Sequence, residues 1–214
     1  MVISIHQPMY LPWLAFFDKL VASDVFVLLD SVQFERNSFI NRNYVKTAQG
    51  RTLLTVPVSL GGHTDETIRT TRIADQRFAA KHLKTISQSY ARAPNAQLLL
   101  PELERLYAVE YETIAQLNEE HLRFWMRWLG IERELIRSSE IETSGTGSDL
   151  VLSICQELDA DRYISGRLGR DYLDVSSFEA AGVDVEFQDF THPSYPQLHG
   201  EFIAGLGVVD YAMA

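Results

Sequence analysis

The chain begins with two short apolar runs separated by a segment of helical period. Residues 2–5 and 25–29 are mostly apolar, which is typical of buried strands. Pro12 suits the first turn of a helix between them, and the apolar residues that follow at helical spacing are Trp13, Phe16, Phe17 and Leu20. Strand, helix and strand with short links predict a βαβ unit, whose two strands are parallel neighbours.

The pattern after the second run is typical of extended chain. Apolar and polar residues alternate through residues 31–43, and Gln49-Gly50 forms a turn signal between two further runs. Such a turn between β-forming segments predicts a hairpin. In this region we expect a hairpin at residues 44–57, a polar loop at residues 61–63 and a strand at residues 67–73.

A period of 3.6 begins at Gln76 and predicts helices as far as Gly130. The apolar positions on one face of the first helix are Ala79, Leu83, Ile86 and Tyr90. Pro94 and Pro101 are expected to lie in the link to a long helical region at residues 103–129. Gly130 is a suitable C-terminal stop for that region.

Strand and helix patterns alternate again in the last third of the chain. We expect a helix at residues 148–158, capped by Ser148, and strands at residues 134–137, 163–165 and 183–190. The elements together predict an α/β fold of Rossmann-like type, with a mainly parallel sheet, a β-hairpin region and a mainly helical insertion at about residues 76–130. We expect a single domain spanning residues 1–214, whose strand order the pattern leaves open.

The charge of the chain is acidic and unevenly distributed. Its 214 residues include 19 Lys and Arg against 29 Asp and Glu, a formal net charge of −10, and no Lys or Arg follows Arg170. A general nucleic-acid binder needs a basic face to neutralise phosphates, so we expect no nucleic-acid partner. Any anionic partner has to be bound by the basic residues of the first two-thirds.

Cysteine content and hydropathy narrow the cellular context. Cys155, the single cysteine, excludes a disulfide framework within the chain and any CxxC motif. Its place on the apolar stripe of the predicted helix indicates an inert core thiol. The N-terminal segment resembles no signal peptide, and no run of about 18 apolar residues is present. We therefore expect a cytoplasmic protein that is not an integral membrane protein.

Polar residues follow several of the apolar runs, at the point where each expected strand ends. They are His6-Gln7, Asp30 and Ser165-Gly166. Ligands of open α/β sheets bind beyond the carboxyl ends of the strands, which makes these residues site candidates. The alternative is ordinary loop capping, because Asp, Asn and Gly favour turns for local reasons.

The loop after the first strand is stiffened by Pro8 and Pro12 and carries His6. A histidine there can act as a general base near neutral pH, and the prolines lower the cost of positioning it. The alternative is a packed turn in which His6 hydrogen-bonds to the backbone. A similar combination follows the last expected strand, in the residues His192, Pro193, Tyr195, Pro196 and Gln197.

Two further motifs are candidates for ion binding. Asn41-Arg42-Asn43, with Arg36 and Lys46 nearby, is the most basic polar stretch, and Arg and Lys there suit a phosphate. The alternative is an ion pair of Arg42 with a neighbouring acid, Asp30 or Glu35. His192, His199 and Asp189 lack a defined metal-binding spacing, so no metal site is expected.

Together, these segments resemble the WbqC-like protein family of bacteria. The resemblance covers almost the whole chain, and its most specific part is the sequence HQPMYLPW at residues 6–13. The other matching segments are residues 17–19, 30–34, 41–43, 54–58, 165–166, 172–173 and 192–197, with His82, Tyr90 and Asp210. The resemblance implies a role in surface-polysaccharide or glycolipid biosynthesis and the attachment of acyl or aminoacyl groups to amino sugars.

The first functional hypothesis is therefore a transferase that moves an acyl or aminoacyl group to an amino sugar. The attacking amine must lose a proton, for which His6 or His192 is the expected base, and the developing oxyanion needs a donor such as Gln7, Asn41 or the Tyr195 hydroxyl. Arg36, Arg42 and Lys46 would hold phosphate. The full set of residues expected to bind substrate is Gln7, Tyr10, Asp30, Gln33, Arg36, Asn41, Arg42, Lys46, Tyr195 and Gln197.

No Cys or Ser nucleophile stands out, so direct transfer is favoured over a covalent enzyme intermediate. The expected partners are a small-molecule, nucleotide-linked or lipid-linked amino sugar and an activated acyl or aminoacyl donor, which an acyl carrier would bring. No further cofactor is expected, and the oligomeric state is left open.

Two other classes of function compete with the transferase. A nucleotide-handling enzyme of the nucleotidyltransferase kind also uses a histidine loop after the first strand, but such enzymes commonly pair two histidines around a glycine. A non-catalytic module that binds sugar would use the aromatic and Gln-containing loops only for stacking and hydrogen bonding. Dependence on a nucleoside triphosphate and on Mg²⁺ would identify the nucleotidyltransferase. Ligand binding without formation of a product would identify the binding module.

Overall fold

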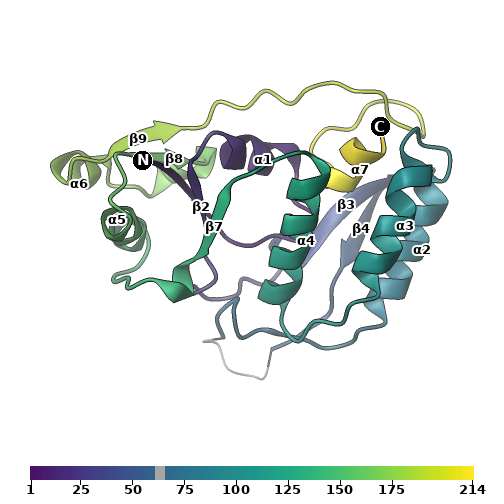
Figure 1. Ribbon diagram of the computed structural model, residues 1–214, viewed down its shortest axis with the longest axis horizontal. Coiled ribbons are helices and arrows are strands. Elements are labelled where there is room, and N and C mark those ends of the chain that lie inside the picture. The colour runs from purple at the N-terminus through teal and green to yellow at the C-terminus, as the bar shows by residue number, and fades with distance from the viewer. Residues whose placement is uncertain (61–65) are drawn as a thin grey trace. The chain divides into compact units, whose positions relative to one another are not determined.

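The computed structural model describes residues 1–60 and 66–214 (Figure 1). The polar loop expected at residues 61–63 lies outside the described residues. The chain divides into two compact units, which are described separately. Unit 1 comprises Met1–Gln7, Ala15–Val32 and Glu132–Thr191, and unit 2 comprises Pro8–Leu14, Gln33–Ile131 and His192–Ala214. The single domain expected over residues 1–214 stays a prediction.

Unit 1 is built on a five-stranded sheet in the order β7-β2-β1-β8-β9, with every neighbouring pair parallel. Numbered along the chain, the order is 3-2-1-4-5, which is a doubly wound arrangement. The expected α/β fold of Rossmann-like type is therefore confirmed. The strands are β1 (Val2–His6), β2 (Val25–Leu28), β7 (Glu134–Arg137), β8 (Arg162–Ser165) and β9 (Asp184–Phe187).

Helices cover both faces of this sheet. α1 (Leu14–Val21) connects β1 to the parallel strand β2, as the βαβ prediction requires, and Phe16 of α1 packs on Phe26 with ring centroids 4.9 Å apart. Ile3 and Ile5 point to the opposite face, where they share a core with α5 (Ser148–Glu157) and α6 (Val175–Ala180). Cys155 lies in that core, and burial raises the pKa of its thiol to about 12.

Three details of unit 1 refine the predicted elements. The helix expected at residues 148–158 is present, but Ser148 is its first residue rather than its cap, and Gly147 takes the cap position. The last strand is shorter than the expected residues 183–190. Two short 3₁₀ helices, η1 (Ser138–Glu140) and η2 (Arg167–Asp171), follow β7 and β8.

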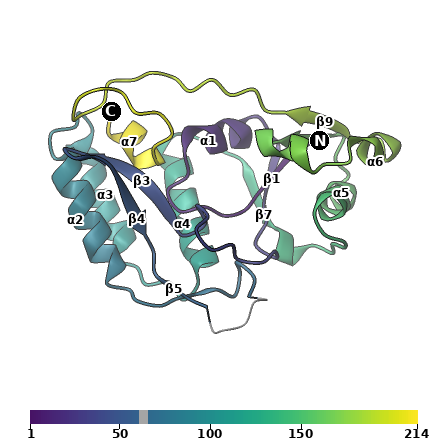
Figure 2. The same cartoon turned by 180° about the vertical axis from the view of Figure 1, so that it is seen from behind.

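Unit 2 contains the expected hairpin and most of the helices. β3 (Arg42–Thr47) and β4 (Gly50–Thr55) pair antiparallel around the predicted turn. The helices are α2 (Phe78–Tyr90), α3 (Ala96–Tyr107), α4 (Ile114–Trp128) and α7 (Val208–Met213). α2 packs against α3 and β3, and α7 contacts α3 and β3, so the hairpin and helices form one layered body (Figure 2). The predicted helical insertion falls within this unit.

Several expectations for unit 2 are wrong in detail. The strand expected at residues 67–73 is reduced to β6 (Arg72–Ile73), which pairs with β5 (Val58–Ser59). The long helix expected at residues 103–129 is two helices, α3 and α4. Pro101, expected in a link, lies inside α3.

The break between α3 and α4 has a local cause. Thr113 is the N-cap of α4, because its hydroxyl accepts the Gln116 N–H while the Gln116 side chain accepts the Thr113 N–H. This capping box starts a new helix at Ile114. α4 ends at Trp128, and Gly130 follows with φ +67°, so the predicted stop is confirmed. None of the helices in the described residues is both long and apolar enough to span a bilayer.

Candidate functional site

The sheet of unit 1 has its topological switch point between β1 and β8. β1 lies between β2, which α1 connects to it, and β8, which the chain reaches only after β7. Pairing of β1 with β8 ends at Ser4 and Ile164, whereas pairing with β2 continues to His6. In open α/β sheets, ligands bind outside the carboxyl ends of the strands at such a switch point.

The carbonyl of Ile5 lies where β8 no longer pairs with β1. The next carbonyl, that of His6, accepts the N–H of Leu29 at 2.9 Å and so points toward β2. Hydrogen bonding alternates from side to side along a central strand, so the Ile5 carbonyl faces β8. Lys19 of α1 fills this position, since its Nζ donates to the Ile5 oxygen at 2.9 Å.

Lys19 is a buried amine that the sequence analysis missed. Its side chain is 2% exposed, and Nζ lies 5.9 Å from the centre of the Phe26 ring. Burial lowers the pKa of Lys19 to about 7, because the charged form loses its hydration. Helical spacing contained the signal, since Lys19 lies three residues after Phe16 and one before Leu20, on the face assigned to the core.

His6 lies beside Lys19 and is held in one tautomer. Its Nδ1 is 2.9 Å from the Gln7 carbonyl oxygen, which can only accept, so Nδ1 carries the proton and Nε2 keeps its lone pair. The ring packs edge-on against Phe16 with centroids 5.0 Å apart. Burial, followed by the charge of Lys19, lowers the pKa of His6 to about 3. His6 is therefore neutral at pH 7, and the backbone contact of the alternative interpretation is also present.

Asp30 follows β2 and binds the start of η1. The side chain is 2% exposed, and its oxygens accept hydrogen bonds from the Ser138 hydroxyl at 3.1 Å, the Ser139 N–H at 3.0 Å and the Ser139 hydroxyl at 2.9 Å. The Ser138 oxygen in turn accepts the N–H groups of Asp30 and Ser31. The contact joins the loops that follow the neighbouring strands β2 and β7, so Asp30 shapes this edge of the sheet.

The end of β8 is packed closely. Ser165 is buried, and its hydroxyl donates to the Gly166 carbonyl at 3.2 Å. Gly169 packs against Ser165 so tightly that any side-chain carbon at residue 169 would collide with the hydroxyl. The segment after β8 therefore requires glycine for close approach.

In unit 2, two of the predicted binding residues, Tyr195 and Gln197, meet Tyr90 around Asp210. This carboxylate is 3% exposed and accepts hydrogen bonds from the Tyr90 hydroxyl at 2.7 Å, the Tyr195 hydroxyl at 3.0 Å and the Gln197 amide at 2.7 Å. Burial, together with the Asp210 charge, raises the pKa of Tyr90 far above its ordinary value. The two tyrosines therefore stay protonated as donors.

Lys46 joins the same network from β3. It is 1% exposed, and its Nζ donates to the Gln197 side-chain oxygen at 3.1 Å and to the carbonyls of Gly200 at 3.4 Å and Glu201 at 2.6 Å. Its backbone N–H donates to the Tyr90 hydroxyl at 2.9 Å. The network connects β3, α2 and the C-terminal segment, so Lys46, Tyr195 and Gln197 all serve the packing of unit 2.

The remaining predicted residues of unit 2 lie apart from this network. Asn41 is buried and donates to the Val56 carbonyl at 2.8 Å, while Arg42 donates to the Asn37 side chain at 3.0 Å. The Nδ1–H of His192 donates to the Pro193 carbonyl at 2.8 Å, as His6 does to the residue after it. Arg36 and Gln33 are exposed.

Comparison with known proteins extends over both units. The model of the WbqC-like protein family matches residues 7–214. The chain belongs to the WbqC-like protein family. It is also 30% identical over 210 residues to "Uncharacterized protein Rv1507c" of Mycobacterium tuberculosis (strain ATCC 25618 / H37Rv), covering 97% of this chain and 91% of that protein. No solved structure matches the chain significantly.

Within the family match, the opening loop contributes Tyr10 to a buried cluster of tyrosines and histidines. The Tyr10 hydroxyl lies 2.5 Å from that of Tyr107 and 2.8 Å from Nδ1 of His82. The His121 ring lies 5.1 Å from the Tyr107 ring and 6.0 Å from the Tyr10 ring. His82 entered the predictions only through the family resemblance and His121 not at all, although each has an inward helical position, with His82 four residues after Phe78 and His121 four before Trp125.

His121 is the least satisfied member of this cluster. It is 1% exposed, and neither ring nitrogen has a hydrogen-bond partner among the described residues. Burial lowers its pKa to about 3, with a further contribution from His82. An imidazole in these surroundings costs folding free energy without an evident return.

Replacing His121 by phenylalanine is therefore expected to raise the free energy of unfolding by about 1–2 kcal/mol at pH 7. The phenyl ring keeps the ring contacts, and the two ring nitrogens without hydrogen-bond partners are removed. The unfolded chain takes up this proton below pH 6.5 and the folded protein only near pH 3, so the wild type loses stability as the pH falls through this window. The variant should show a shallower acid limb in urea unfolding at pH 4–7. His199→Asn, which suits the φ of +62°, is the comparison at an exposed histidine whose Nε2 is hydrogen-bonded to the Ser89 carbonyl at 2.7 Å. Equal slopes in all three proteins would contradict the assignment.

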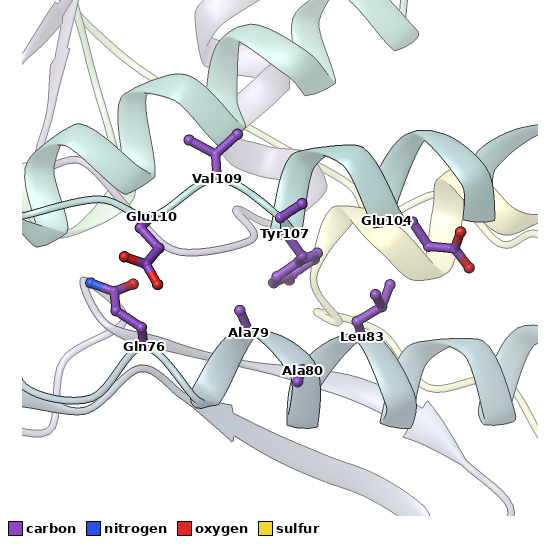
Figure 3. Close-up of a pocket in the computed structure, with 9 residues that line it drawn as sticks. Gln76, Ala79, Ala80, Leu83, Glu104, Tyr107, Val109 and Glu110 are labelled. Carbon is purple, nitrogen blue, oxygen red and sulfur yellow. The ribbon is translucent and has the colours of Figure 1, made fainter.

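A separate pocket of about 310 Å³ opens between α2 and α3 (Figure 3). Ala79 and Leu83, which the periodicity placed on the packed face of α2, line it instead, while Phe78, His82 and Ile86 are buried. The Tyr107 ring points between the two helices, and the side chains of Gln76 and Glu110 face one another at one end. None of the residues predicted to bind substrate lines this pocket.

Proposed function

We propose that this family member is a transferase of surface-polysaccharide or glycolipid biosynthesis that moves an acyl or aminoacyl group to an amino sugar. Family membership supports the biosynthetic context, and the edge of the unit 1 sheet supports a reaction site. The observation that carries the proposal is His6, which is neutral, fixed in one tautomer and placed where β1 and β8 separate. Such a group keeps the Nε2 lone pair at the carboxyl end of β1.

The chemistry of the proposal follows from what acyl transfer to an amine requires. The amine nitrogen attacks the carbonyl carbon of the activated donor, the bond to the leaving sulfur or oxygen breaks, and one amine proton has to go to a base. Nε2 of His6 accepts a hydrogen bond from the incoming amine and so aligns it. The contact of Nδ1 with the Gln7 carbonyl keeps the ring in place.

A nucleotide-handling enzyme is the second candidate, and the strand order is the observation that favours it. A 3-2-1-4-5 sheet places its switch point where dinucleotides and mononucleotides bind in many α/β proteins. The same crevice would accept a nucleotide-linked sugar in the transferase. The two candidates therefore differ in the reaction rather than in the place of binding.

Mass spectrometry of reaction mixtures tests the proposal directly. The purified protein is incubated with glucosamine, galactosamine or their UDP-linked forms, together with acetyl-coenzyme A or an aminoacyl thioester. The expected result is an amino sugar heavier by one acyl or aminoacyl group, formed without ATP or Mg²⁺. Nucleoside triphosphate consumption with release of pyrophosphate would establish the nucleotidyltransferase instead, and sugar binding without any product would establish the binding module.

Alanine at His6 is expected to lower kcat/KM by about 10²–10⁴-fold, because alignment of the acceptor is lost while the remaining binding contacts stay. Alanine at His192, the other predicted base, is the matched control and should leave turnover within about threefold. Product formation by liquid chromatography and substrate affinity by calorimetry separate the two effects. The opposite ranking of the variants would move the reaction site to His192.

A further inference from the structure

Lys19 occupies its buried position at a cost that its contacts do not repay. Within residues 1–60 and 66–214 no carboxylate forms an ion pair with it, and its single hydrogen bond is the one to the Ile5 carbonyl. A neutral hydrogen bond contributes only about 1 kcal/mol, whereas burying an unpaired ammonium costs far more. A methionine or leucine would fill the same space on α1 and lose the bond to Ile5, at about 1–3 kcal/mol. That loss is smaller than the cost of the buried charge, so the fold gives no net reason for a lysine.

The described groups that face the Lys19 nitrogen carry no charge. His6 approaches from β1 and is neutral, and Phe26 of β2 presents its ring. Asp18, the adjacent acid on α1, is exposed and accepts a hydrogen bond from the Gln188 side chain at 2.6 Å. An uncharged Lys19 amine donates one N–H to Ile5 and keeps a lone pair at the same edge of the sheet as Nε2 of His6.

We propose that Lys19 is the general base of this site, and that the proton lost by the acceptor amine passes to its uncharged Nζ. The inference rests on the proposed transferase. In the step, the new bond joins the acceptor nitrogen to the carbonyl carbon, and the bond from that carbon to the donor's sulfur or oxygen breaks. Nζ takes the amine proton and then returns it to the leaving thiolate or alkoxide, so that Lys19 is uncharged again after each turnover.

The division of roles between Lys19 and His6 follows from their environments. A base works best when its pKa lies near the operating pH, and the pKa of Lys19 is about 7. His6, with a pKa of about 3, holds a proton too weakly to be the acceptor at neutral pH, although it orients the substrate well. Two neighbouring groups with pKa values pushed apart are a common mark of an assigned acid and base.

The first test compares variants in the mass-spectrometric assay, with the donor and acceptor that give product. Lys19→Met should lower kcat by about 10²–10⁴-fold with little change in KM, and Lys19→Arg should fail to rescue it, because a guanidinium keeps the charge but cannot release its proton. Lys84→Met, at an exposed position of α2, is the matched control. Activity of Lys19→Arg within threefold of the wild type would overturn the role of base.

The pH dependence separates a base from a merely structural lysine. The wild-type kcat/KM should rise tenfold per pH unit up to about pH 7 and then level off, because only the uncharged amine accepts a proton. This rise of kcat/KM below pH 7 should persist in His6→Ala, whose maximal kcat/KM is lower, and should disappear in Lys19→Met. A rise that disappears only in His6→Ala would assign the base to His6 instead.

A measurement without substrate distinguishes failure of this inference from failure of the proposed function. The chain contains four lysines, so the carbon-13 signals of its ε-methylene groups can be resolved and assigned with Lys19→Met. The Lys19 signal should titrate near pH 7 in the intact protein. If wild type forms no product from any pair, the transferase fails, and a Lys19 that titrates near pH 7 still identifies a proton acceptor at this edge. A Lys19 that titrates near pH 10 overturns the inference in either case.

Discussion

Replacing Lys19 by methionine is expected to stabilise the protein at neutral pH, although it removes a hydrogen bond. The pKa of Lys19 is lowered from 10.5 to about 7, which corresponds to roughly 5 kcal/mol of unfavourable free energy when both states are compared below pH 7. Loss of the bond to Ile5 returns about 1–3 kcal/mol. We expect the free energy of unfolding to rise by about 2–4 kcal/mol at pH 6–7.

The sign of the pH dependence follows from the same shift. Between pH 7 and 10.5 the unfolded chain holds a proton on Lys19 that the folded protein has released, so wild-type stability increases with pH. The advantage of the variant should therefore shrink by about 1.4 kcal/mol per pH unit from pH 7 to 10. Urea unfolding of both proteins at pH 6, 7, 8 and 9 measures the difference between their free energies of unfolding. The contributions of all other titrating groups are the same in both proteins and cancel in this difference.

Lys84→Met provides the matched control for this measurement, since an exposed lysine should change stability by less than about 0.5 kcal/mol at every pH. A variant at Lys19 that is less stable than wild type by a constant amount would show that the lysine serves the fold. A more stable and inactive variant is the result expected for a group retained for function, because active sites often cost stability.

Replacing Asp210 by asparagine is expected to have the opposite effect and to lower the free energy of unfolding by about 1–3 kcal/mol. The buried carboxylate accepts three hydrogen bonds, from Tyr90, Tyr195 and Gln197. Hydrogen bonds to a charged group contribute more than neutral ones. An amide keeps the shape, but its NH₂ group would face donors, which leaves buried polar atoms unsatisfied.

Asp189→Asn is the control for Asp210, because Asp189 belongs to the same acid-rich C-terminal stretch and is exposed. It should change stability by less than about 0.5 kcal/mol. Urea unfolding at pH 7 measures both variants. Equal, small effects would mean that the network around Asp210 contributes little, and that the acids of this stretch act only as surface charge.

Local patterns predicted most of the elements of the fold. The period-2 and period-3.6 signals depend on neighbouring residues alone, so β1, α1, β2 and the hairpin at Gln49-Gly50 were all predicted. The error at Pro101 shows the limit of such signals, because a proline is tolerated inside α3 where tertiary contacts hold the helix. The capping box at Thr113 and Gln116 was a readable signal for the break that the analysis did not use.

The candidate site was predicted in part. The rule that ligands bind at strand ends selected His6 and Asp30, and both lie at the carboxyl edge of the unit 1 sheet. Lys46, Tyr195 and Gln197 were chosen for their chemistry, and the structure places them in one buried network. Lys19 was not selected because the apolar stripe was defined by its apolar residues alone, so the lysine on the same face entered only through the family resemblance.

The sequence by itself determined the fold class, the family resemblance and the loop that carries His6, because hydrophobic period, turn residues and a specific motif are local properties. Only the tertiary structure decided the strand order and the set of side chains that meet in the interior. In that order β2 pairs with β7, although residues 33–131 lie between the two strands in the sequence. Pairing and burial depend on contacts between distant segments. The pKa of Lys19 is therefore a property of the folded sheet and helix, and the same lysine in the unfolded chain is an ordinary cation.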